Sequence, residues 1–173
     1  MNRANQKWNN LMINSGKEIE RRLSVLQGLE LSSVNHAADM LTLGFGALRP
    51  VTNFRGAVKH VGAWALHVQC AWRLEQAGRV AATEDDLRGG DEKASATVAR
   101  LQQLLFGDAV APTVESVAVN EASGLLLSLS HELRLTVIPD AIQEEEDWRF
   151  FAPGVNAAHL VITQGKIAPE SFD

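Results

Sequence analysis

The sequence predicts an α+β domain: a mainly antiparallel β-sheet of meander form, with about two helices packed on one face or end. Short stretches with strand periodicity follow one another through most of the chain, separated by short turns, and only two stretches carry a helical repeat. The chain has 173 residues, 46% hydrophobic and 21% charged, which is typical of one globular domain. We therefore expect a single domain over residues 1–173, with residues 1–14 as a flexible N-terminal arm.

The first helix is expected over residues 16–27. Ser15 and Glu18 have the spacing of a capping box, in which each side chain accepts a hydrogen bond from an unpaired backbone N–H group. Glu18 and Arg22 are placed to pair one turn apart, and Gly28 supplies a left-handed stop. The apolar positions fall on one helical face: Ile19, Leu23 and Leu26.

The next stretch gives a strand and a connection. Residues 29–39 leave strand and loop both open, whereas residues 40–45 alternate apolar with small or polar side chains and predict a strand. Residues 46–59 include Pro50 and Gly56 and are interpreted as a long connection. This connection is the one locally basic stretch of the chain, through Arg49, Arg55 and Lys59.

Residues 64–74 carry the clearest strand pattern in the chain, because apolar and mixed positions alternate throughout. One set should form a core stripe: Trp64, Leu66, Val68, Cys70, Trp72 and Leu74. The other set should form a half-polar face: Ala65, His67, Gln69, Ala71 and Arg73. A turn at 76–78 and a second strand at 79–83 follow. The single cysteine thus belongs to the core, cannot form an internal disulfide, and suits a reducing compartment.

The C-terminal half predicts one helix and then strands. Residues 84–91 are an acidic, glycine-containing loop, and Asp91 is expected to cap a helix that ends at Phe106. Five strands should follow, at residues 115–120, 125–130, 133–138, 148–151 and 159–163. Trp72-Arg73-Leu74 and Trp148-Arg149-Phe150 are similar, which leaves an internal duplication open.

The composition of the chain argues against several classes of function. The net charge of −5 argues against a nucleic-acid binder, which needs a basic face for phosphate contacts. The start of the chain lacks the basic and apolar regions of a secretory signal, and no apolar run approaches the ~18 residues of a membrane span. We expect a soluble bacterial-type cytoplasmic protein that does not bind membranes.

The common catalytic motifs do not occur. Gly44 and Gly46 begin like a dinucleotide loop, but the third position is Arg49. His131 and the glutamate after it begin like a zinc-protease motif, but Leu135 stands where the second histidine belongs. His67 and Cys70 would point to opposite faces of a strand, and no serine-hydrolase motif is present. We expect no catalytic residue, no metal and no cofactor.

Two surfaces are candidate binding sites. The polar face of the 64–74 strand offers His67, Gln69 and Arg73, which Arg149 would join from a neighbouring strand to bind an anion or a small molecule. The alternative is a solvated outer sheet face. The second surface consists of two acidic runs that would face a protein partner, hold a divalent ion or simply be solvated: Glu84, Asp85 and Asp86, and Glu144, Glu145, Glu146 and Asp147.

Four segments resemble a group of small bacterial proteins of unknown function: Leu41–Gly46, Ala65–Leu74, Trp148–Phe150 and His159–Ile162. The similarity spans about residues 29–167, and no catalytic residue transfers with it. Some small acidic α+β bacterial proteins are immunity partners of toxins, which is an analogy of size and charge. We therefore expect a non-catalytic protein that binds a protein partner, with a small-molecule or anion binder as the alternative and an unrecognised hydrolase third. Exposed edge strands also leave homo-oligomerisation open.

Overall fold

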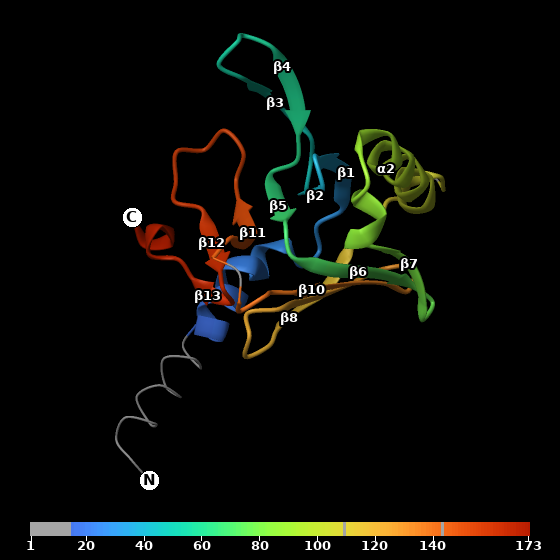
Figure 1. Ribbon diagram of the computed structural model, residues 1–173. Coiled ribbons are helices and arrows are strands. Elements are labelled where there is room, and N and C mark those ends of the chain that lie inside the picture. The colour runs from blue at the N-terminus through green and yellow to red at the C-terminus, as the bar shows by residue number, and fades with distance from the viewer. Residues whose placement is uncertain (1–14, 109, 143) are drawn as a thin grey trace.

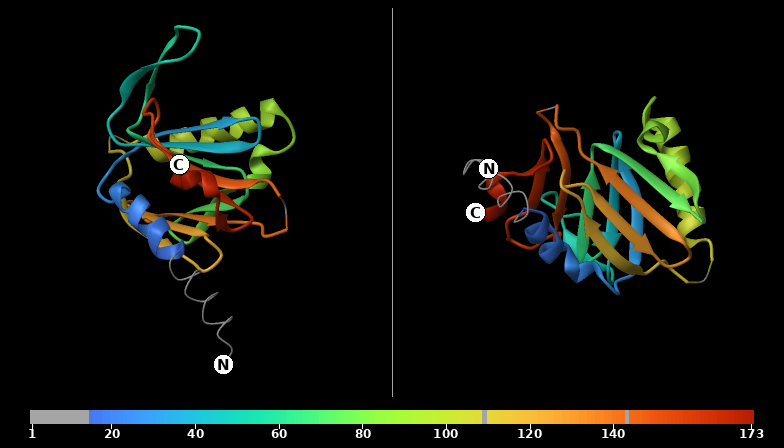
Figure 2. Two further views of the ribbon diagram at one scale, coloured as in Figure 1. Left: turned by 90° about the vertical axis from the view of Figure 1, so that its left-hand side faces the viewer. Right: turned by 90° about the horizontal axis from the view of Figure 1, so that it is seen from below.

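The computed structural model describes residues 15–108, 110–142 and 144–173, and these form an α+β fold of antiparallel sheets (Figures 1 and 2). The predicted fold class is therefore confirmed, although the strands divide among three sheets instead of one meander. The expected arm over 1–14 lies outside the described residues. Within the described ranges no helix has the length and apolarity needed to cross a membrane.

The largest sheet has six strands in the order β1-β2-β5-β11-β12-β13, and every neighbouring pair is antiparallel. Its strands are β1 Leu31–Ala37, β2 Met40–Phe45, β5 Trp64–Val68, β11 Glu146–Phe151, β12 Leu160–Thr163 and β13 Lys166–Ile167. Residues 29–39, left open between strand and loop, thus contain an edge strand.

The second sheet has five strands in the order β7-β6-β10-β9-β8. Its strands are β6 Ala71–Gln76, β7 Arg79–Thr83, β8 Val114–Val119, β9 Leu125–Leu129 and β10 Leu133–Ile138. Two tight turns in this sheet have residues with positive φ, Ala77 with Gly78 and His131 with Glu132. Turns of this kind match the right-handed twist of the strands that they join. The predicted strands of this region are confirmed.

A third, two-stranded sheet pairs β3 Arg49–Thr52 with β4 Val58–Val61 and projects from the rest of the molecule (Figure 1). The prediction of a long connection over residues 46–59 was wrong here. Pro50 is compatible with a strand because this ribbon has only two strands, so each has an edge that needs no further hydrogen bonds. Gly56 takes a left-handed conformation in the turn between β3 and β4, so it connects the two strands.

The core lies between the two large sheets and continues to α2 Asp91–Phe106, which packs on β1 and on the 3₁₀ turn η2 Glu84–Leu87. The predicted helix ending at Phe106 is confirmed, and its apolar positions are buried on one face: Ala94, Val98, Leu101 and Leu105. Gly90, not Asp91, occupies the N-cap position. Asp91 instead supplies negative charge in the first turn, where the helix dipole favours it.

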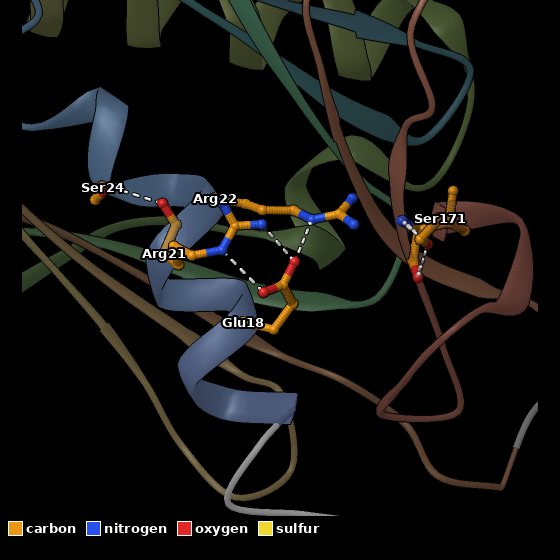
Figure 3. A network of polar contacts seen from close by, with 6 residues as sticks. Glu18, Arg21, Arg22, Ser24 and Ser171 are labelled. Carbon is orange, nitrogen blue, oxygen red and sulfur yellow. Dashed lines mark hydrogen bonds and ion pairs between the residues drawn. The ribbon is translucent and has the colours of Figure 1, made fainter. Parts of the chain in front are cut away.

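Residues 15–23 are helical, run into the 3₁₀ turn η1 Ser24–Leu26, and lie across the molecule from α2 (Figure 2). The Glu18 carboxylate accepts hydrogen bonds from Arg21 Nε at 2.9 Å and Arg22 Nε at 2.9 Å, as Figure 3 shows. These bonds, Arg21 first, lower the pKa of Glu18 to about 2. The expected Glu18–Arg22 pair is thus confirmed. The Arg22 guanidinium also lies over the ring of Phe172, in the 3₁₀ turn η3 Pro169–Phe172.

The predicted strand over 64–74 is two strands that belong to different sheets, because the chain bends at Gln69 and Cys70 between β5 and β6. The alternation continues through the bend, so that Val68, Cys70 and Trp72 are all buried. This continuity explains why the pattern predicted one strand. The prediction that Cys70 belongs to the core is confirmed.

Asp147 holds this bend. Its backbone carbonyl accepts hydrogen bonds from the N–H groups of Gln69 at 2.8 Å and Cys70 at 3.0 Å. Its carboxylate accepts from the N–H groups of Asp140 at 2.9 Å and Gly165 at 2.8 Å. Only 3% of Asp147 is exposed, so these bonds replace the water that a charged group would otherwise require.

Asp147→Asn should lower the free energy of unfolding by about 1–3 kcal/mol, because an amide N–H would replace one acceptor oxygen and face a backbone donor. The urea midpoint should fall while the slope of the transition stays constant. Glu145→Gln is the matched control, since this side chain is exposed on the same run, and it should change the free energy by less than about 0.5 kcal/mol. Equal midpoints for the two variants would contradict the role given to Asp147.

Candidate functional site

The outer face of the six-stranded sheet brings two of the predicted binding residues together. β5 and β11 are neighbours, and His67 lies directly opposite Arg149 in their register. Thr42 of β2 lies opposite His67 on the other side. Arg149 thus joins His67 from a neighbouring strand, as expected from the sequence.

The other two predicted binding residues do not join this face. Gln69 is exposed at the bend, and Arg73 lies on β6 in the second sheet, where its Nε atom is 3.3 Å from Glu75 Oε1. The expectation that His67, Gln69 and Arg73 share one strand face was wrong because the chain changes sheets between them.

A compact cluster surrounds His67 and Arg149. The ring of Phe151 meets His67 edge-on, with centroids 4.9 Å apart, and stacks on His159 at 4.3 Å. Arg149 donates from Nε and Nη2 to the two carboxylate oxygens of Glu146, at 3.0 and 2.7 Å. Its Nη1 group donates to His159 Nδ1 at 3.1 Å. The guanidinium is thus already paired with a carboxylate, which reduces its value as an anion site.

The electrostatics of the cluster favour neutral imidazoles. Burial, the charge of Arg149 and the neighbouring His159 lower the pKa of His67, against an opposing effect of Glu146. Burial and Arg149 likewise lower the pKa of His159. Arg149 keeps its charge because its bonds to Glu146 raise its pKa. Both histidines can therefore offer one donor and one acceptor near neutral pH.

A groove of about 640 Å³ separates this face from the projecting β3-β4 ribbon. We call it the hairpin groove. Its sheet side includes Ser33, Thr42 and His67, and its ribbon side includes Lys59 and His60. No aspartate or glutamate lines it in the part of the chain that the structure describes. Such a volume is suitable for a small molecule.

The ribbon itself carries an exposed aromatic side chain. Phe54, in the turn between β3 and β4, is 93% exposed, and the Arg55 guanidinium carbon lies 5.3 Å from its ring centroid. The turn is fixed by Asn53, whose Oδ1 atom accepts hydrogen bonds from the N–H groups of Arg55 and Ala57, both at 2.9 Å. Residues 40–74 contain no aspartate or glutamate, so the ribbon is basic in an otherwise acidic chain.

The two predicted acidic runs are largely used within the fold. Glu84 accepts from the Trp72 N–H group at 3.2 Å, and Asp86 accepts from the Thr83 N–H group at 2.9 Å. Glu146 binds Arg149, and Asp147 is buried at the bend, as described above. The exposed members are Asp85, Glu144 and Glu145.

Nucleophilic and metal chemistry find little support in the described residues. Burial, with a smaller effect of Asp147, raises the pKa of the Cys70 thiol to about 12, so the thiolate form is scarce at neutral pH. No group of three or more His, Cys, Asp or Glu side chains in these residues is arranged to hold a metal ion.

Sequence reasoning missed several groove and cluster residues, among them Phe151, His159, Thr42, Lys59 and His60. Phe151 had a usable signal, because it lies two positions after Arg149 and therefore on the same strand face. The sequence shows Lys59 only as a member of the basic stretch over residues 46–59. Neither Lys59 nor His60 could be placed beside His67, because the fold of the ribbon was not predicted.

Comparison of the chain with protein-family models, with curated proteins and with solved structures finds no match. The resemblance to small bacterial proteins of unknown function therefore stays a prediction.

Ring protons of His67 and His159 should titrate by NMR with midpoints below ~6.5, the usual value for histidine. Arg149→Gln should raise both midpoints, because it removes a positive charge and leaves Glu146 unopposed. Arg73→Gln, on the other sheet, should leave them unchanged and is the matched control.

Because the folded-state pKa lies below the unfolded one, these histidines should make the free energy of unfolding fall as pH drops from about 6.5 toward the folded midpoints. Midpoints at or above 6.5, or equal effects of the two variants, would contradict this description of the cluster.

Proposed function

We propose that this chain is a non-catalytic binding protein whose β3-β4 ribbon docks on an acidic surface of a partner protein. The observation that carries the proposal is Phe54, a large aromatic side chain 93% exposed in the turn of a ribbon that pairs with neither large sheet. Exposed aromatic side chains of this kind are typical anchors of protein interfaces.

The ribbon is suited to this task because its turn is already ordered. The two hydrogen bonds to Asn53 Oδ1 and the left-handed Gly56 fix the loop that presents Phe54. A pre-ordered loop loses less conformational entropy on binding than a mobile one.

Charge favours an acidic partner over a basic one. Arg55 lies beside the aromatic anchor, and Lys59 lies on the same ribbon, without a carboxylate between residues 40 and 74. A basic partner, such as the toxin of an immunity pair, would be repelled by the ribbon that presents Phe54, because Arg55 and Lys59 lie on it. Opposite charge would also accelerate association.

We further propose that the protein acts in a bacterial cytoplasm. The single cysteine supports this, because a reducing compartment keeps it a thiol.

Phe54→Ser should weaken binding of the partner at least about tenfold, because it removes the proposed anchor. The partner is first recovered with the tagged full-length chain from the cells that produce it, and its affinity is then measured at physiological salt. Ile142→Ser is the matched control, since this apolar side chain is 88% exposed but lies in the loop after β10.

Arg55→Glu should also weaken this complex, because an acidic partner surface would repel the new carboxylate. The loss of affinity should become larger as the salt concentration is lowered. Equal affinities for Phe54→Ser and Ile142→Ser would overturn the proposal. So would a basic partner, a nucleic acid, or a dimer of this chain, detected by sedimentation, that Phe54→Ser dissociates.

A further inference from the structure

We propose that the hairpin groove is a binding site for a small organic anion, with Lys59 and His67 contacting its carboxylate or phosphate group. This site is separate from the exposed tip of the ribbon that carries Phe54. The proposal stands on the shape of the groove, on the charge of its lining and on polar groups that face it without partners.

The charge of the lining selects an anion. The groove is lined by one lysine, Lys59, by three imidazoles, those of His36, His60 and His67, and by no carboxylate among the described residues. The chain as a whole has a net charge of −5, so an acid-free groove runs against its composition. A cationic ligand would find no charged partner there, whereas an anion would meet Lys59 directly.

Two polar groups on the sheet side have unused hydrogen-bonding capacity. Thr42 and His67 are opposite each other in the register of β2 and β5, and both line the groove. Among the described residues, neither side chain takes part in a hydrogen bond or an ion pair. His67 is half-buried, so its ring nitrogens would gain more from a bound ligand than a fully exposed imidazole would.

The remaining walls favour an apolar or planar body on the ligand. Phe151, Pro153 and Val61 supply apolar surface, and the ring of Phe151 is held by its contacts with His67 and His159. On the sheet side, Ser33 Oγ would lie only 2.4 Å from a Cβ atom at Gly44, so the serine hydroxyl covers the glycine and forms part of this wall. Apolar walls with a few polar groups are typical of small-molecule sites.

Binding should depend on pH in a defined direction. The groups that face His67 are Arg149 and His159, which disfavour its protonation, and Glu146, which favours it. A bound anion would add negative charge beside the imidazole and would therefore favour the protonated form. Affinity for a carboxylate, whose own charge is constant in this range, should consequently rise as pH falls from 8 to 6.

The test uses three anionic probes, namely benzoate, phenyl phosphate and inorganic phosphate, with neutral benzamide as the comparison. Amide shifts of Thr42, Gly44, Gly62 and His67 are followed by NMR at pH 6 and 8 in the full chain. We expect saturable shifts with at least one aromatic anion, tighter binding of benzoate at pH 6 than at pH 8, and weaker binding of benzamide. Benzoate and phenyl phosphate distinguish a carboxylate ligand from a phosphate ligand.

Lys59→Gln and His67→Gln should each weaken binding of the effective probe about tenfold. Lys59 is exposed, so Lys59→Gln tests the site even where the half-buried His67 position does not tolerate change. Lys17→Gln, on the N-terminal helix, and Phe54→Ser should leave probe affinity unchanged, which separates this site from the protein interface proposed above. The proposal is overturned by an absence of saturable shifts with all three anions, by benzamide binding as tightly as benzoate, or by probe affinity that Lys59→Gln does not change.

Discussion

The hydrogen bonds of Asp147 at the β5-β6 bend are the constraint on which the rest of the structure depends. One residue binds the backbone of Gln69 and Cys70 through its carbonyl and the backbone of Asp140 and Gly165 through its carboxylate. Three segments distant in sequence therefore meet at the point where one continuous stretch leaves the first sheet and enters the second. Both large sheets can then cover a common core.

The bend also decides which polar residues can act together. It leaves His67 on the first sheet, opposite Arg149, and moves Arg73 to the second sheet beside Glu75. The Glu146 carboxylate that pairs with Arg149 is next to Asp147 in β11. The hydrogen bonds that hold the bend and the polar cluster around His67 therefore depend on the same strand. The stability of the fold and the charge balance on the outer face of the six-stranded sheet thus both depend on β11.

Local pattern was sufficient to predict much of this fold. The helix over 91–106 and the strand at 133–138 follow from helical and alternating repeats, whose periods differ. The bend was not predictable, because a strand that changes sheets keeps its inside–outside alternation. The burial of Asp147 was not predictable either, because an acidic run predicts exposure to solvent. Only the fold supplies the backbone N–H groups that make burial of this carboxylate favourable. The site was half predicted, since His67 and Arg149 meet but the ribbon that completes the groove was interpreted as a connection.

Native-state hydrogen exchange at the bend is the most direct test of the central role of Asp147. The N–H groups of Gln69 and Cys70 lie outside β5 and β6, so without the Asp147 carbonyl they would behave as loop amides. Both amides should exchange only through global unfolding, with the same free energy as core amides such as that of Leu66. Exchange of these two amides through local opening, at a free energy close to that of the exposed β3-β4 turn, would contradict this role of Asp147.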